Sequence, residues 1–273
     1  MRNVEKDDNK KIFCMNKLAS EFIAKSTAKV VDAGHREKIK FNIGKYNAVV
    51  PQAKKQFVNV DAVRELAKNR KWLAIENLDK YLEEFEKKIT AHGAKVIWAE
   101  TADDALKEIE KICKHKKCKT LVKSKSMVTE EIGLNEHLHK FGIESIETDL
   151  GEYIQQLDGE PPYHIVTPAM HKSKEDIAQL FAEKLNVPKG LSPEELTQVA
   201  RKILREKYAQ AEVGMTGANF IIADIGGIAV TENEGNARLS SSFPKTHIVV
   251  AGIEKVIPSI NDLALFWPLL ATF

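Results

Sequence analysis

The feature that most constrains the fold is a change of hydrophobic rhythm after His92-Gly93. Upstream, apolar residues recur at helical spacing; downstream, short apolar runs of strand type alternate with amphipathic helical segments. Predicted strands cover 94–98, 120–122, 143–146, 164–166 and 248–250, and predicted helices cover 102–113, 130–141, 177–185, 193–211 and 263–270. Such alternation predicts an α/β fold with a mostly parallel sheet flanked by helices.

The N-terminal third has a different character. From about Asn16 to Ala91 the sequence is strongly charged and reads as helix, with an expected break near Val49-Val50-Pro51 because proline disfavours a continuing helix. The last of these helices carries Leu78, Leu82, Phe85 and Ile89 on one face. We therefore expect a helical N-terminal region over 1–91 and an α/β core over 92–273.

Composition excludes several classes of protein. Lys and Arg total 41 against 39 Asp and Glu, so a broad basic surface for nucleic acid is not expected. No apolar run approaches the roughly 20 residues of a transmembrane helix, and the charged N-terminus is unlike a signal peptide. The interpretation is a cytoplasmic protein without a transmembrane segment. Its three cysteines, Cys14, Cys113 and Cys118, lack cluster or zinc spacing, and Cys113 is expected to be a buried thiol.

Two apolar runs, Phe220–Ala223 and Ile228–Val230, predict a buried hairpin that leads into Thr-Glu-Asn-Glu-Gly-Asn. Glu232 and Glu234 lie two residues apart and share one face of an extended segment, while Asn233 and Asn236 add amides and Gly235 permits close approach of a ligand. One of the two carboxylates is a candidate general base or nucleophile. An ordinary polar turn is the alternative interpretation.

A second polar loop, Lys123-Ser124-Lys125-Ser126, follows the predicted strand at 120–122. Ligands of parallel sheets bind beyond the carboxyl ends of the strands, and Lys and Ser suit a carboxylate or phosphate. The alternative interpretation is a simple solvated loop, because Glu130 and Glu131 in the next helix would compete with any bound anion.

Two further groups carry weaker signals. One group comprises Glu147, Asp149 and Glu152, which suit acid/base work or a hard cation. The favoured interpretation is that Asp149 caps a helix, with Glu152 as its partner in a capping box. No metal site is predicted. His171-Lys172 is a secondary candidate at another strand end.

Together these motifs resemble the lactate utilization protein B family, whose members contain the LUD domain. The resemblance rests on Lys123–Ile132, Glu147–Ile154, Gly217–Phe220 and Thr231–Asn236, in that order. It implies a fold like the ribose-phosphate isomerase and CoA-transferase superfamily. It also implies a role in an iron–sulfur oxidoreductase complex that oxidises L-lactate to pyruvate, with other subunits of that complex as partners. The 4Fe-4S clusters belong, by resemblance, to a C-terminal segment absent from this sequence, so we expect an excised LUD domain that holds no cofactor itself.

The resulting site hypothesis combines both polar loops. Lys123 and Lys125 hold the carboxylate of a small substrate, and Glu232 or Glu234 lies near the reacting carbon. The remaining predicted substrate-binding residues are Ser124, Ser126, Thr216, Asn219, Thr231, Asn236 and His171. Two alternatives stay open: an isomerase or CoA-transferase-like enzyme that uses a Glu of the Glu-Asn-Glu-Gly loop, and a non-catalytic assembly scaffold.

Overall fold

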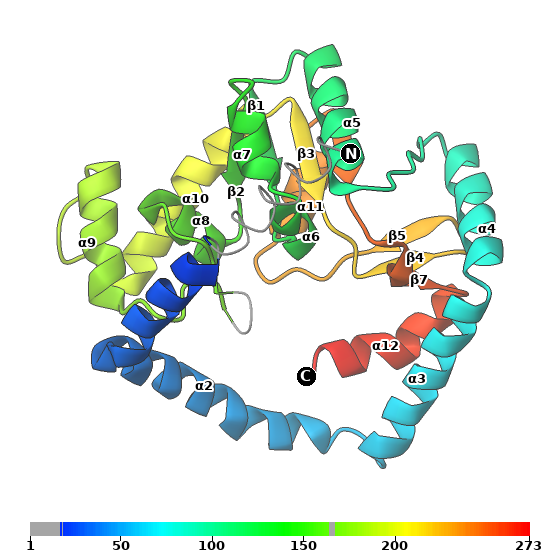
Figure 1. Cartoon of the computed structure of the whole chain (residues 1–273), viewed down its shortest axis with the longest axis horizontal. Coiled ribbons are helices and arrows are strands. Elements are labelled where there is room, and N and C mark those ends of the chain that lie inside the picture. Colours follow the sequence, from blue (N-terminus) through cyan, green and yellow to red (C-terminus); the bar gives the residue numbers. More distant parts are fainter. Residues whose placement is uncertain (1–16, 18, 164–166) are drawn as a thin grey trace, which may run out of the picture.

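Among the described residues, four parallel strands form a sheet that helices flank (Figure 1). The computed structural model describes residues 17, 19–163 and 167–273. The strands are β1 (Thr120–Lys123), β2 (Glu144–Glu147), β3 (Val213–Thr216) and β6 (Thr246–Val249). Their order is β2-β1-β3-β6, and each neighbouring pair is parallel. The predicted α/β class is therefore confirmed.

Helices cover both faces of this sheet, and the strands divide the core between them. Leu121 packs in one apolar cluster and Val122 in another, because successive strand residues point to opposite faces. The Val122 cluster includes residues of α8 (Leu150–Asp158), α9 (Lys174–Leu185) and α10 (Pro193–Gln210), and the Leu121 cluster includes residues of α5 (Ala102–His115) and α7 (Leu134–His139). Cys113 is buried in the latter cluster, as predicted.

The predicted hairpin is confirmed and belongs to a second, smaller sheet. Strands β4 (Phe220–Ile222) and β5 (Gly227–Ala229) are antiparallel, and β7 (Val256–Ile257) pairs in parallel with β4. The helices α3 (Val60–Glu76), α4 (Leu78–Ala91) and α12 (Leu263–Leu270) pack against it. Phe85 of α4 shares a buried cluster with Ile221 and Val256, which confirms the predicted apolar face of that helix.

Helix α2 (Ala33–Lys54) runs along one side of the molecule, from near α9 to near α3 (Figure 1). The expected break near Pro51 is wrong, since α2 continues through that proline and ends one turn later. The break falls instead before α3, where the Asn59 side chain accepts a hydrogen bond from the Ala62 amide. Polar contacts attach α2 to the body: the Asn42 amide donates to the Met170 carbonyl at 2.7 Å, and the Lys38 ammonium pairs with Asp176.

Three other predicted elements, at 94–98, 130–141 and 164–166, differ from the structure or lie outside the described residues. The strand expected at 94–98 is wrong: those residues form no described ladder, and half of the Trp98 surface is exposed above α4, where its indole donates to Glu86. The helix expected at 130–141 is split into α6 (Met127–Glu131) and α7, because Gly133 adopts a φ of +70° between them. The strand expected at 164–166 lies outside the described residues.

Strands β3 and β7 have no counterpart among the predicted strands. The residues of β3 were expected only to lead into the hairpin, but Val213–Thr216 forms a strand between β1 and β6. None of the helices among the described residues combines the length and hydropathy that crossing a bilayer requires.

Gly214 provides a test of the central sheet. A Cβ atom at this position would lie 1.7 Å from the carbonyl oxygen of Ser240 in α11 (Asn236–Ser242), so Gly214→Ala must push α11 away from β3. We expect a loss of about 3 kcal/mol in the free energy of unfolding, measured by urea denaturation. Gly44→Ala is the matched control, because Gly44 lies inside α2 with open space around it and alanine should stabilise the helix by about 0.5–1 kcal/mol. An unchanged midpoint for Gly214→Ala would contradict this close packing.

Candidate functional site

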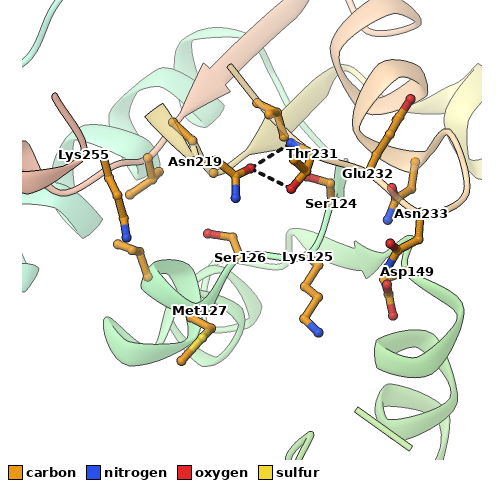
Figure 2. A pocket seen from close by; sticks show the side chains of 16 residues that line it. Ser124, Lys125, Ser126, Met127, Asp149, Asn219, Thr231, Glu232, Asn233 and Lys255 are labelled. Atoms are coloured by element: carbon orange, nitrogen blue, oxygen red, sulfur yellow. Dashed lines mark hydrogen bonds between the residues drawn. The ribbon is translucent and has the colours of Figure 1, made fainter. Parts of the chain in front are cut away.

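The loops that follow all four parallel strands meet at one edge of the central sheet and enclose a cleft of about 320 Å³ (Figure 2). Ser124–Ser126 follow β1, Asp149 follows β2, Gly217–Asn219 follow β3, and Val250 follows β6. The chain passes from β1 to β2 on one side of β1 and returns to β3 on the other. Open α/β sheets bind ligands at such a switch point, so this cleft is the candidate site.

The structure brings together most of the residues predicted from the two polar loops. The predicted residues that line the cleft are Ser124, Lys125, Ser126, Asn219, Thr231, Glu232 and Asn236. Asp149, for which helix capping was the favoured interpretation, and Lys255, which was not among the predicted site residues, line it as well. Lys255 immediately precedes β7, whose two-residue length left no periodic signal in the sequence.

Asn219 is held in one orientation by Thr231. Its Oδ1 accepts hydrogen bonds from the Thr231 backbone amide at 2.8 Å and from the Thr231 hydroxyl at 3.1 Å. Because a backbone amide can only donate, the acceptor end of the Asn219 side chain is assigned without ambiguity. Its Nδ2 donor faces the space above Ser126 (Figure 2).

Two lysines give the cleft its positive charge. Lys125 comes from the β1–α6 loop, and Lys255 from the segment before β7, on another wall (Figure 2). Both side chains are partly buried, and Lys255 has Glu254 3.5 Å away. With the hydroxyls of Ser124 and Ser126, these cations can bind a carboxylate or a phosphate through charge-assisted hydrogen bonds.

The Glu232 carboxylate is bound by Arg238. Arg238 donates to it from its backbone amide at 2.8 Å and from its guanidinium at 2.7 and 3.1 Å. Burial opposes ionisation of Glu232, but these hydrogen bonds outweigh it and keep the pKa of the carboxyl below its ordinary value. Glu232 therefore lines the cleft as an ionised group held at the start of α11.

Glu234 does not line the cleft, although it lies at its rim. Its Oε2 accepts a hydrogen bond of 3.2 Å from the Leu150 amide, next to the cleft residue Asp149. Burial, and then the charge of Asp149, raises the pKa of the Glu234 carboxyl above its ordinary value, although the Leu150 hydrogen bond opposes this. The two carboxylates of the Glu-Asn-Glu-Gly loop thus have pKa values shifted in opposite directions.

Three other predicted residues lie away from the cleft lining. Lys123 is fully buried, with its Nζ 2.7 Å from Glu147 Oε1. Thr216 is buried in β3, where its hydroxyl lies 3.0 Å from His247 Nε2. His171 packs against the Tyr163 ring with centroids 4.2 Å apart and contacts Glu160 at 3.0 Å. Of the two lysines predicted to hold a substrate, only Lys125 reaches the cleft.

The acidic group at the end of β2 has two separate roles. Asp149 caps α8, since its Oδ1 accepts from the Glu152 amide at 3.1 Å, as the favoured interpretation held. The Glu152 side chain does not complete a capping box. Its carboxyl lies instead beside Glu147 and Lys123, and burial, together with the charge of Glu147, raises its pKa to about 9.

The cysteines do not fit an iron–sulfur cluster. A cubane cluster takes four thiolate ligands, and the whole sequence has three cysteines. Of these, Cys113 and Cys118 are buried and free, and Cys14 lies outside the described residues. Electron transfer through a 4Fe-4S cluster therefore needs ligands from elsewhere.

Comparison with known proteins agrees with the motifs at this edge of the sheet. Lactate utilization protein B from Bacillus licheniformis and from Bacillus subtilis are each 46% identical over 212 residues, which cover 77% of this chain and 44% of the relative. The protein of that name from Oceanobacillus iheyensis is 46% identical over 207 residues, covering 76% and 43%. The chain thus spans less than half the length of these curated relatives. No solved structure matches it significantly. The family model described as LUD domain matches residues 82–272, which include every strand and the whole cleft, and the chain therefore belongs to the LUD domain family.

Proposed function

We propose that this LUD domain takes part in lactate utilization, in an iron–sulfur oxidoreductase complex that oxidises L-lactate to pyruvate, and that its cleft binds the small carboxylate. The observation that carries the proposal is the cationic, hydroxyl-rich cleft at the carboxyl edge of the sheet. The relatives' shared name, Lactate utilization protein B, supports the same function. A cytoplasmic location is part of this proposal.

In this proposal, the carboxylate of the substrate binds to Lys125 and Lys255. The hydroxyls of Ser124 and Ser126 and the Nδ2 group of Asn219 add neutral donors. This set has more donors than a single carboxylate accepts, so one of them is available for the 2-hydroxyl group of lactate. Asn233 and Asn236 also line the cleft and would limit the length of the acid that fits.

Oxidation of lactate to pyruvate removes the hydroxyl proton and passes the C2 hydrogen with two electrons to a two-electron acceptor, which a partner subunit of the complex would supply. We assign the proton to Glu234, because it lies beside the cleft residue Asp149 through its hydrogen bond to the Leu150 amide, whereas Arg238 binds Glu232; the raised pKa of Glu234 also suits a general base. Glu232, bound by Arg238, holds the loop and adds a fixed negative charge to the wall. In the transferase alternative, the same engagement of Glu232 would leave Glu234 as the loop carboxylate that attacks an acyl-CoA.

Lactate binding tests the assignment of the two cleft lysines. Lys125→Ala and Lys255→Ala should each weaken binding of L-lactate or pyruvate about tenfold, because each removes one charge-assisted contact worth about 1.5 kcal/mol. Isothermal titration calorimetry at low and high salt measures the effect. Lys245→Ala, in an exposed loop outside the cleft, is the control. Equal affinity of all four proteins would refute the carboxylate site.

Lactate-dependent dye reduction by the reconstituted complex tests Glu234. Glu234→Gln keeps an acceptor for the Leu150 amide but cannot take a proton, so the rate should fall at least about 100-fold if Glu234 is the base. Glu206→Gln, exposed on α10, should retain the rate of the unmodified protein. A Glu234→Gln rate within threefold of the unmodified protein would show that the residue only holds the loop on α8.

The N-terminal helices support the assembly part of the proposal. Helix α2 has no buried residue, and it exposes Phe41, Tyr46 and Val49, each by half or more of its surface. The preceding helical residues expose Phe22 and Val31 as well. Apolar side chains exposed in such number are typical of a protein–protein contact, and we propose that partner subunits of the complex cover them.

A double variant separates assembly from binding. Phe41→Glu with Val49→Glu places two charges in the proposed contact, and co-purification with the partner subunits should fall at least tenfold. Lactate affinity should stay unchanged, because neither residue lines the cleft. Charges on other exposed residues, as in Thr197→Glu on α10, serve as the control. Normal assembly of the double variant would contradict an interface on α2.

A further inference from the structure

Near the carboxyl end of β2, three carboxylates from three elements converge. Glu147 ends β2, Glu152 lies in the first turn of α8, and Glu130 lies in α6. One oxygen of each lies within 4.8 Å of the others. Glu147 and Glu152 are buried, with 4% and 2% of their surface exposed. The cluster is separate from the cleft lining, although Ser124 and Asp149, which do line the cleft, are neighbours of its members in sequence.

An ion pair and a hydrogen bond, both to the same oxygen, orient the Glu147 carboxylate. Lys123 Nζ lies 2.7 Å from Oε1, and Asn135 Nδ2 donates to the same oxygen at 2.8 Å. The other oxygen, Oε2, is buried and has no hydrogen-bond donor among the described residues. Metal-binding carboxylates commonly have this arrangement, in which outer donors fix one oxygen and leave the other for the ion.

Glu152 provides an independent observation. Neither of its oxygens has a hydrogen-bond donor among the residues that the structure describes, although the side chain is almost completely buried. Asn135 Oδ1 is likewise buried without a donor. A buried carboxylate without hydrogen-bond donors is costly, and four buried oxygens lack a donor in the described part of the chain: Glu147 Oε2, Glu152 Oε1 and Oε2, and Asn135 Oδ1.

Charge points to the kind of partner. A divalent cation bound by the three carboxylates would displace the proton that burial favours on Glu152, and three carboxylates, the Lys123 ammonium and the ion would together be close to neutral. Oxygen-only ligands select hard cations, and oxygens within 4.8 Å of one another suit metal–oxygen distances of about 2.4 Å. We propose that Glu130, Glu147 and Glu152 bind one hard divalent cation of the Ca²⁺ or Mn²⁺ type, with Asn135 as a further oxygen ligand.

Such an ion would join the parts of the structure that shape the cleft. Glu147 is two residues from Asp149, and Lys123 precedes the Ser124–Ser126 loop. A cation between β2, α6 and α8 would hold these loops in place without touching the substrate. The site is thus structural, and it goes beyond the proposed role in lactate utilization.

Metal titration of the full chain, stripped with chelator and returned to metal-free buffer, tests the proposal. We expect one Mn²⁺ per chain by electron paramagnetic resonance, displaced by Ca²⁺, and a rise of several degrees in Tm with either ion. Glu152→Gln keeps the shape of the side chain and removes one charged ligand, so Mn²⁺ affinity should fall at least tenfold. Glu131→Gln, exposed and adjacent to Glu130, should bind Mn²⁺ as the unmodified chain does.

The alternative, in which a proton on Glu152 alone balances the cluster, predicts a different result. Glu152→Gln would then be at least as stable as the unmodified chain, and neither protein would bind Mn²⁺ or Ca²⁺ at millimolar concentration. That result, or equal Mn²⁺ affinity of Glu152→Gln and the unmodified chain, would overturn the proposal. Because the readout is metal binding, it is independent of whether the cleft binds lactate.

Discussion

Parallel pairing of β1 with β3 is the constraint on which the cleft depends. The register places Lys123 opposite Met215, and the Ser124 amide donates to the Met215 carbonyl at 3.0 Å, so both strands end together. The Lys-Ser-Lys-Ser loop and the Gly217–Asn219 segment therefore leave the sheet side by side. Gly214 in β3 allows α11 to pack closely on this strand, because any side chain there would collide with the backbone of α11.

Several polar side chains in and around the loop after β5 form hydrogen bonds that hold the loop itself in place. Glu232 binds Arg238, Glu234 binds the Leu150 amide, and Asn219 binds Thr231. These contacts join the hairpin to α11, to α8 and to the end of β3. A loop fixed in this way presents its remaining donors in a defined geometry, which a site that recognises a small carboxylate requires.

Periodicity predicted the elements well where one face of each element is buried. The apolar stripe of 102–113 and the run at 120–122 are both correct because burial on one side imposes a pattern on the sequence. The failures have local causes. Residues 94–98 have a strand-like composition but pair with no strand in the part of the chain that the structure describes. Pro51 lies so near the end of α2 that it removes little from the helix.

The sequence by itself determined the fold class, the hairpin and the family, because these depend on local hydrophobic patterns and on contiguous motifs. Tertiary structure decided which charged residues can contact a ligand in the cleft. Lys123 and Lys125 look equivalent in sequence, yet the end of β1 buries Lys123 against Glu147, while Lys125 reaches the cleft. Lys255 joins the site, and Glu130 joins Glu147 and Glu152, only through long-range packing of separate elements, which no local spacing encodes.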